Sequence, residues 1–132
     1  MTEKAPEETR GEGKKNSTVL VVDDNAQHLQ IYCWMLQRQG YQCIPALVGS
    51  TSVDLPTSKS ICMVLLDYRL NSSLTAADVA DRLKVGFPSA PIVILSELPW
   101  MPEDAQGYAK GFVHKGEPDR LMETVARFCG AK

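Results

Sequence analysis

Three short, nearly continuous apolar runs constrain the fold of this chain more than any other feature. They are Thr18–Val22, Ile61–Leu66 and Ile92–Leu95. Apolar runs without alternation are typical of strands that are buried on both faces, as in parallel sheets covered by helices. Each run is far shorter than the ~20 apolar residues that a membrane span needs. Two weaker strands are expected at Gln42–Ala46 and Gly111–His114.

The segments between the runs show the spacing of amphipathic helices. Apolar residues recur at i, i+3, i+4 and i+7 over Ala26–Gln39 and again over Ala76–Leu83. A C-terminal helix is predicted to begin with Pro118 at its first position, and a shorter one is expected to begin at Pro102. Residues 49–60 would complete the alternation, but a proline and several Ser/Thr residues there favour a short or broken helix.

Five strands alternating with about five helices predict an α/β fold. We expect a doubly wound, five-stranded parallel sheet of flavodoxin-like type with helices on both faces. The length of 132 residues, with 44% hydrophobic and 23% charged residues, suits a single domain with its own core. Residues 1–16 are polar and lack apolar periodicity, so they are predicted to be a disordered tail.

Composition excludes several classes of protein. Lys and Arg number 14 against 16 Asp and Glu, and a chain without basic excess is a poor nucleic-acid binder. The first residues lack the apolar core of a signal peptide, so we expect a cytoplasmic protein that does not associate with membranes. The cysteines lack metal-finger spacing and are expected to be buried, reduced thiols: Cys33, Cys43, Cys62 and Cys129.

Chemically useful side chains follow the predicted strands. Asp23 and Asp24 come directly after the first run, and Asp67 follows the second. Ser96 follows the third run, and Lys115 follows the last weak strand. Because the carboxyl ends of parallel strands meet at one edge of the sheet, these side chains are expected to form one cluster.

Three neighbouring carboxylates repel one another unless a cation or a proton is present. Oxygen ligands with spare coordination positions suit Mg²⁺, with Mn²⁺ as an alternative. The chain contains neither a G-K-[ST] phosphate loop nor a recognisable Ser-His-Asp arrangement. The combination that fits is phosphoryl transfer onto a carboxylate, with the metal ion and lysine neutralising the phosphoryl oxygens and the hydroxyl donating to one of them.

Four motifs resemble one known family. The segments 21–25 (VVDDN), 65–70 (LLDYRL), 94–96 (ILS) and 112–115 (FVHK) are similar to those of the receiver domain of two-component response regulators. The resemblance runs from about Thr18 to the C-terminus, so residues 17–132 are identified as a receiver domain of the stand-alone, single-domain type.

The resemblance implies a role for each residue. Asp67 would be the phosphoacceptor, and Asp23 and Asp24 would hold Mg²⁺ together with Asp67 and the backbone carbonyl of Arg69. Lys115 would pair with the phosphoryl group.

Activation is implied to depend on two further residues. Ser96 would form a hydrogen bond to the phosphoryl group, and Phe112 would rotate in concert with it. Phosphorylation would thereby shift an existing equilibrium and reshape the face made by the fourth helix and the fourth and fifth strands.

The chain departs from the family pattern at several places, among them a lengthened connection at residues 98–102 (LPWMP). The turn after the phosphoacceptor segment is replaced by Asn71–Ala76, which lacks the usual glycine. Lys115 is followed by Gly116 where the family has proline, so a cis peptide is not expected there. Glu97 stands where a small residue is common, and together with Arg69 it is expected to modulate the rate and lifetime of phosphorylation.

The family resemblance implies a sensor histidine kinase or a histidine phosphotransfer protein as phosphoryl donor and an unknown downstream protein as target. A homodimer through the fourth helix is a habit of the family. The domain would catalyse its own phosphorylation and dephosphorylation and would not turn over free substrates. Because no output domain follows Lys132, it would act alone, relay phosphoryl groups, or be part of a longer protein.

Two other functions stay open. One is a phosphorylation-independent interaction module on the same fold, which Glu97 and the altered turn favour. The other is a small Mg²⁺-dependent phosphohydrolase, for which the chain shows no second general acid. Among the remaining residues, Trp34 and Met35 are expected to fill space around the core, and Trp100 is either a partner anchor or a packed loop tip. His114 is expected to face away from the site.

Overall fold

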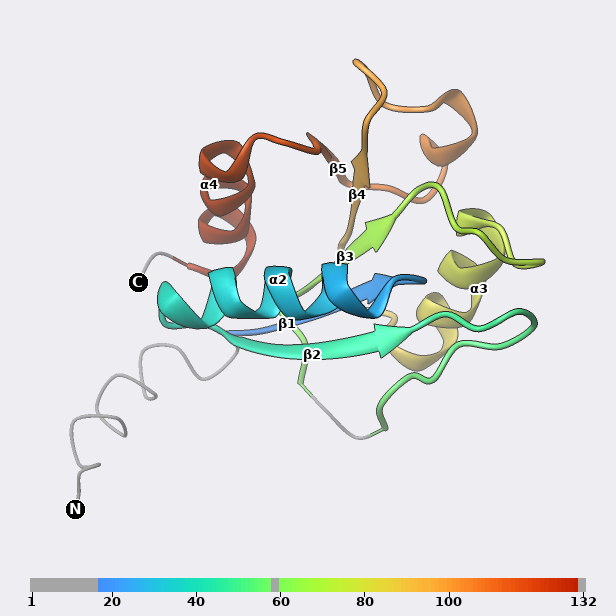
Figure 1. Ribbon diagram of the computed structural model, residues 1–132, viewed down its shortest axis with the longest axis horizontal. Helices are drawn as coiled ribbons and strands as arrows, with labels where there is room; N and C mark the ends of the chain where they lie inside the picture. Colours follow the sequence, from blue (N-terminus) through green and yellow to red (C-terminus); the bar gives the residue numbers. More distant parts are fainter. Residues whose placement is uncertain (1–16, 58–59, 131–132) are drawn as a thin grey trace.

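The computed structural model describes residues 17–57 and 60–130, so the predicted tail at 1–16 lies outside the described residues. The strands and helices alternate along the chain (Figure 1). In chain order they are β1 (Thr18–Asp23), α2 (Ala26–Arg38), β2 (Gln42–Leu47), β3 (Met63–Asp67), α3 (Ala76–Gly86), β4 (Ile92–Ser96), the 3₁₀ turn η1 (Glu103–Ala105), β5 (Gly111–His114) and α4 (Pro118–Cys129).

The strands form one parallel sheet in the order β2-β1-β3-β4-β5. The chain moves outward from β1 to one edge and then returns past it toward the other edge, which is the doubly wound arrangement that the sequence predicts. All five predicted strands are present. Strand β3 begins at Met63, two residues after the start of the second apolar run, although the Cys62 N–H already donates to the Thr18 carbonyl at 2.9 Å.

Strand residues alternate between two cores. Val19, Val21 and Leu65 pack with Leu29 and Leu36 of α2 and with residues of α4. Their neighbours along the strands pack on the other face against α3 and Ala105 of η1, among them Leu20, Val22, Val64, Leu66, Ile92 and Ile94. Helices α2 and α4 therefore cover one face of the sheet and α3 covers the other (Figure 1).

One expected helix is absent from the described residues, and another is reduced to a single 3₁₀ turn. Between β2 and β3 the chain instead makes a tight turn, in which the Gly49 N–H donates to the Ser52 carbonyl at 2.7 Å and Val48 bridges Val53. Between β4 and β5 the helix expected at Pro102 is only the three-residue turn η1. Prolines in both connections remove backbone donors, which disfavours longer helices.

The expectation of reduced thiols is wrong, because all four cysteines form disulfides. Cys33 of α2 is bonded to Cys43 of β2, with their Cα atoms 5.3 Å apart. Cys62, just before β3, is bonded to Cys129 at the end of α4, with a Cα–Cα distance of 5.4 Å. Each bond joins a helix to the sheet.

The two tryptophans lie at the surface. Trp34 is 58% exposed and has the Arg38 guanidinium 4.9 Å above its ring, so the expectation that it fills space around the core is wrong. Met35 does pack against the core beneath α2. Trp100 is 69% exposed, which rules out the packed loop tip. No helix in the described part of the chain is long and apolar enough to cross a membrane.

Candidate functional site

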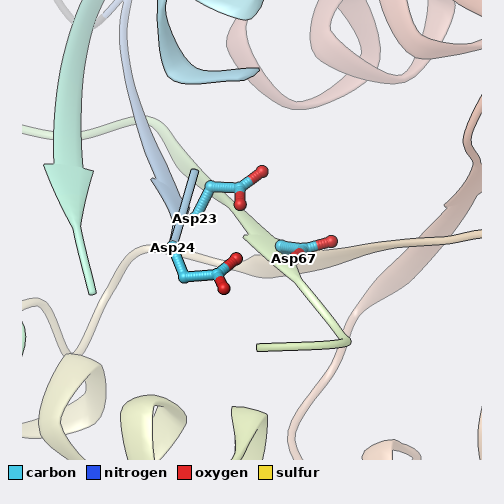
Figure 2. A group of neighbouring side chains, drawn as sticks. All are labelled: Asp23, Asp24 and Asp67. Atoms are coloured by element: carbon cyan, nitrogen blue, oxygen red, sulfur yellow. The ribbon is translucent and has the colours of Figure 1, made fainter. Parts of the chain in front are cut away.

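The carboxyl ends of the strands bring the predicted residues together. Asp23 ends β1, Asp67 ends β3 and Ser96 ends β4, while Asp24 and Lys115 follow β1 and β5 directly. One carboxylate oxygen from each of the three aspartates lies within 4.8 Å of the others. Figure 2 shows these three side chains gathered at the adjoining ends of β1 and β3.

A cleft of about 180 Å³ opens over this cluster. Two of the site residues predicted from the sequence, Asp23 and Phe112, do not line the cleft. Asp23 is buried next to it, at the end of β1. His114 does not line it either, as strand alternation predicts, and its Nε2 instead lies 3.0 Å from the Glu97 carbonyl. The cleft is lined by Asp24, Asn25, His28, Asp67, Arg69, Ser96, Glu97 and Lys115.

The shortest contact in the cleft is an ion pair between Lys115 Nζ and Asp67 Oδ1 at 2.6 Å. The Asp67 side chain is 3% exposed and that of Lys115 is 19% exposed, so the pair is shielded from water. Burial alone lowers the pKa of Lys115, but the hydrogen bond and the attraction to Asp67 outweigh it and raise the pKa. Lys115 is therefore a fixed positive charge against one oxygen of Asp67.

Two carboxylates of the cluster, those of Asp23 and Asp67, resist ionisation. Burial and the neighbouring Asp67 raise the pKa of Asp23 from 3.8 to about 6. Burial also raises the pKa of Asp67, although Lys115 opposes that increase. Burial is the largest cause of both pKa shifts, and the crowding of acidic groups that the sequence indicates adds to it.

The donor atoms fit a divalent cation. The Asp23 Oδ1 atom accepts the Asn25 N–H at 3.0 Å, whereas its buried Oδ2 atom accepts no hydrogen bond from the described residues. The Asp24 Oδ2 atom accepts the Asn71 N–H at 2.8 Å. Each aspartate thus has one carboxylate oxygen that takes part neither in these hydrogen bonds nor in the ion pair with Lys115. Oxygen-only donors with room for water or phosphate are the environment that Mg²⁺ favours.

His28 is a residue of the site that sequence reasoning missed. Its Nδ1 atom lies 3.4 Å from the Asp23 Oδ2 atom. Asn25 caps α2 by accepting the His28 N–H at 3.0 Å, so the start of the helix places the imidazole beside the carboxylates. The available signal was the position of Asn25, which follows Asp23 and Asp24 directly and precedes the predicted helix, so that His28 falls in the first turn of the helix.

The altered turn after Asp67 is well anchored. Ser72 Oγ donates to the Gly49 carbonyl at 2.6 Å and accepts the Leu74 N–H at 3.0 Å. The Ser73 N–H donates to the Ser50 carbonyl at 3.0 Å. Hydrogen bonds to the β2–β3 connection therefore replace the glycine turn of the family. No peptide bond in the described residues is cis, in agreement with the expectation for Gly116.

The residues predicted to act in switching or to modulate the reaction lie partly at the cleft and partly in the core. Ser96 is buried, and its Oγ accepts the Leu98 N–H at 3.0 Å. Phe112 is half-buried and packs against the core on the α3 face of the sheet. Glu97 and Arg69 are exposed, and both line the cleft. The structure places these residues, while their roles stay predictions.

The pKa of Asp23 leads to a prediction about stability. Because the folded protein holds this proton more tightly than the unfolded chain does, the contribution of Asp23 is most favourable below about pH 4 and is lost as the pH rises through about 6. In a chelating buffer, Asp23→Asn should raise the free energy of unfolding at neutral pH by about 3 kcal/mol and flatten its dependence on pH. Urea unfolding across this pH range measures both effects. Equal pH dependence in the wild type and the variant would contradict the assignment.

Comparison with known proteins bears on the fold. No protein-family model and no curated protein matches the chain. Among solved structures, the chemotaxis protein CheY4 of Vibrio cholerae is 21% identical with a TM-score of 0.68, and the match covers 85% of this chain and 98% of that one.

Two further structures are similar. The response regulator TrrA of Thermotoga maritima, solved in complex with Mg²⁺-BeF, is 22% identical with a TM-score of 0.67, over 85% of this chain and 98% of that one. The receiver domain of a sensor histidine kinase from Pseudomonas aeruginosa, with a magnesium ion in its active-site cleft, is 16% identical with a TM-score of 0.67. The match covers 88% of this chain and 99% of that one. The chain therefore has the fold of response regulator receiver domains.

Proposed function

We propose that this domain is a phosphoacceptor of phosphorelay signalling, and that Asp67 receives the phosphoryl group in a Mg²⁺-dependent reaction. The observation that supports it most is the buried Asp67, which lies in contact with Lys115 and within 4.8 Å of two further carboxylates beneath an open cleft. Receiver domains of the same fold strengthen the proposal, because two of them were solved with magnesium.

The chemistry follows from the arrangement. A carboxylate oxygen of Asp67 attacks the phosphorus of the donor, the bond from phosphorus to the donor's nitrogen or oxygen breaks, and the donor leaves with that electron pair. The positive charge of Lys115 stabilises the negative charge that develops on the phosphoryl oxygens over the cleft. When bound, Mg²⁺ would neutralise the remaining negative charge, with Asp23, Asp24, Asp67 and the Arg69 carbonyl as its protein ligands.

Binding of the phosphoryl group would draw on Ser96. Its hydroxyl now accepts the Leu98 N–H and has its own proton free to donate into the cleft, which it lines. A phosphoryl oxygen on Asp67 would attract that proton and shift the β4–β5 connection together with Phe112. Because η1 replaces the expected fourth helix, this connection is the surface that would present the signal to a downstream protein.

The proposed donors are a sensor histidine kinase or a histidine phosphotransfer protein. The domain would catalyse only its own phosphorylation and dephosphorylation, since the 180 Å³ cleft is small for a substrate-binding site. The interaction module that does not need phosphorylation is the second candidate, and the exposed Trp34 and Trp100 favour it. The two candidates differ in whether Asp67 reacts.

Beryllofluoride, which mimics a phosphoryl group on a carboxylate, tests the site without covalent chemistry. With Mg²⁺ present, beryllofluoride should raise the melting temperature, and a ligand at 100 times its Kd adds about 2.7 kcal/mol of stability. Differential scanning calorimetry measures this rise, and it should vanish in a chelating buffer. Asp67→Asn is the matched control because it keeps the shape of the side chain. An equal rise in that variant would contradict the proposal.

A further inference from the structure

The two disulfides differ in their surroundings. Cys33–Cys43 joins the middle of α2 to the edge strand β2, and both residues are only partly buried. They line a surface groove of about 420 Å³ between the helix and the strand, together with Pro45 and Leu47 of β2 and with Asp54. A molecule in this groove would lie against both cysteines of the bond.

Cys62–Cys129 lies inside the protein. Cys62 is 6% exposed and Cys129 is 9% exposed, and both belong to the core between the sheet and α4. The Cys62 Sγ atom also lies 3.2 Å from the Thr18 carbonyl oxygen. A thiolate must approach a disulfide sulfur directly to displace its partner, so this bond is protected unless α4 moves away.

From this contrast we propose that Cys33–Cys43 is a thiol–disulfide exchange site for a dithiol reductant, and that Cys62–Cys129 is a permanent crosslink. A thiolate of the reductant attacks one sulfur, the protein S–S bond breaks, and a mixed disulfide forms. The second thiolate of the reductant then attacks that mixed disulfide. Two electrons pass to the protein, Cys33 and Cys43 each take up a proton, and the reductant leaves as a cyclic disulfide.

The groove indicates which reductant fits. Among the residues that line it, Asp54 is the charged one and the others are apolar or uncharged, including Leu29, Gln30 and Gln37. A dithiol whose only charge is the attacking thiolate meets less repulsion from Asp54 than a thiol that carries further negative charges.

The fold tolerates opening of this bond. Leu29 and Leu36 hold α2 on the sheet by burial, independently of the disulfide. Reduction therefore frees the helix from the edge strand without removing its core contacts. The same helix is capped by Asn25 and holds His28 near Asp23, so the exchange site belongs to the element that forms one wall of the cleft.

Selective reduction of the folded full-length chain tests the proposal. The protein is incubated with dithiothreitol without denaturant, free thiols are trapped with iodoacetamide, and alkylated residues are identified by intact mass and peptide mapping. A species with two alkyl groups, on Cys33 and Cys43, should form at least about tenfold faster than alkylation of Cys62 and Cys129. Its far-UV circular dichroism should equal that of the oxidised protein, and an oxidised dithiol should restore the bond.

Two variants separate the bonds. Cys62→Ala/Cys129→Ala retains only the proposed exchange site and should be reduced at the wild-type rate, while Cys33→Ala/Cys43→Ala should resist reduction. Equal or faster alkylation of Cys62 and Cys129 in the wild type would overturn the proposal. Reduction of Cys33–Cys43 only on global unfolding, or a failure to reoxidise, would overturn it as well.

Discussion

Replacing Lys115 by alanine is expected to slow phosphoryl uptake from acetyl phosphate by about 10²–10³-fold, the usual loss when one preorganised donor is removed from a transition state. Lys115 contacts Asp67 at 2.6 Å and is the cation that the structure places against the proposed nucleophile. Its loss also leaves a buried carboxylate unpaired, which raises the pKa of Asp67 and lowers the fraction in the reactive, ionised form. Time-resolved intact mass measures the rate.

Lys110 offers a matched control for this substitution. It lies just before β5, its side chain is exposed, and its backbone N–H already donates to the Ile92 carbonyl. Lys110→Ala removes the same charge and the same side chain near the same strand, and should leave the rate unchanged. A Lys115→Ala rate within about threefold of the wild type would contradict the role of this lysine in the transition state.

Removing the Cys62–Cys129 disulfide is expected to lower the free energy of unfolding by about 4 kcal/mol. The bond closes a loop with a sequence separation of 67, so its loss frees a large part of the unfolded chain. It also attaches α4 to the start of β3, on the face of the sheet that α4 covers. Urea unfolding of Cys62→Ala/Cys129→Ala measures the loss, with the m-value as a check that the transition stays two-state.

The other disulfide provides the comparison. Cys33→Ala/Cys43→Ala opens a loop with a separation of only 10, for which the same argument gives about 2.7 kcal/mol. The longer loop should therefore cost more. A smaller loss for the Cys62–Cys129 variant than for the Cys33–Cys43 variant would show that loop entropy does not govern these bonds.

The sheet and the site could be predicted because each rests on a local signal. Apolar runs such as Ile92–Leu95 mark doubly buried strands, and parallel topology brings the residue after each run to one edge. Asp23, Asp67, Ser96 and Lys115 therefore met as expected. What the sequence could not supply was the finer geometry, such as the contact between Lys115 and Asp67.

The disulfides could not be predicted because they depend on contacts between distant elements. Cys62 and Cys129 are brought together only when α4 packs across β3, and no local spacing reports that contact. The even number of cysteines was compatible with both states. Disulfides persist in oxidising compartments and are rare in the cytosol, so the expected cytoplasmic location stays a prediction.

The helices were predicted less well where the helical spacing of apolar residues was short or interrupted. The 49–60 segment contains Gly49 and Pro56, and its backbone groups bond within a turn and with Ser72 and Ser73. At Pro102, acidic residues at a favourable helix start were not followed by an apolar stripe, and only one turn formed. Trp34 lies outward because the narrow core stripe of α2 is filled by Leu29 and Leu36.

The most direct test of the phosphoacceptor assignment is the intact mass of the protein after incubation with acetyl phosphate and Mg²⁺, with Asp67→Ala measured in parallel. We predict a gain of one phosphoryl group in the wild type, lost in a chelating buffer and absent from the variant. An unchanged wild-type mass, in a protein that also fails to respond to beryllofluoride, would contradict the assignment. An equal gain in Asp67→Ala would likewise contradict it, since the group would then reside on another residue.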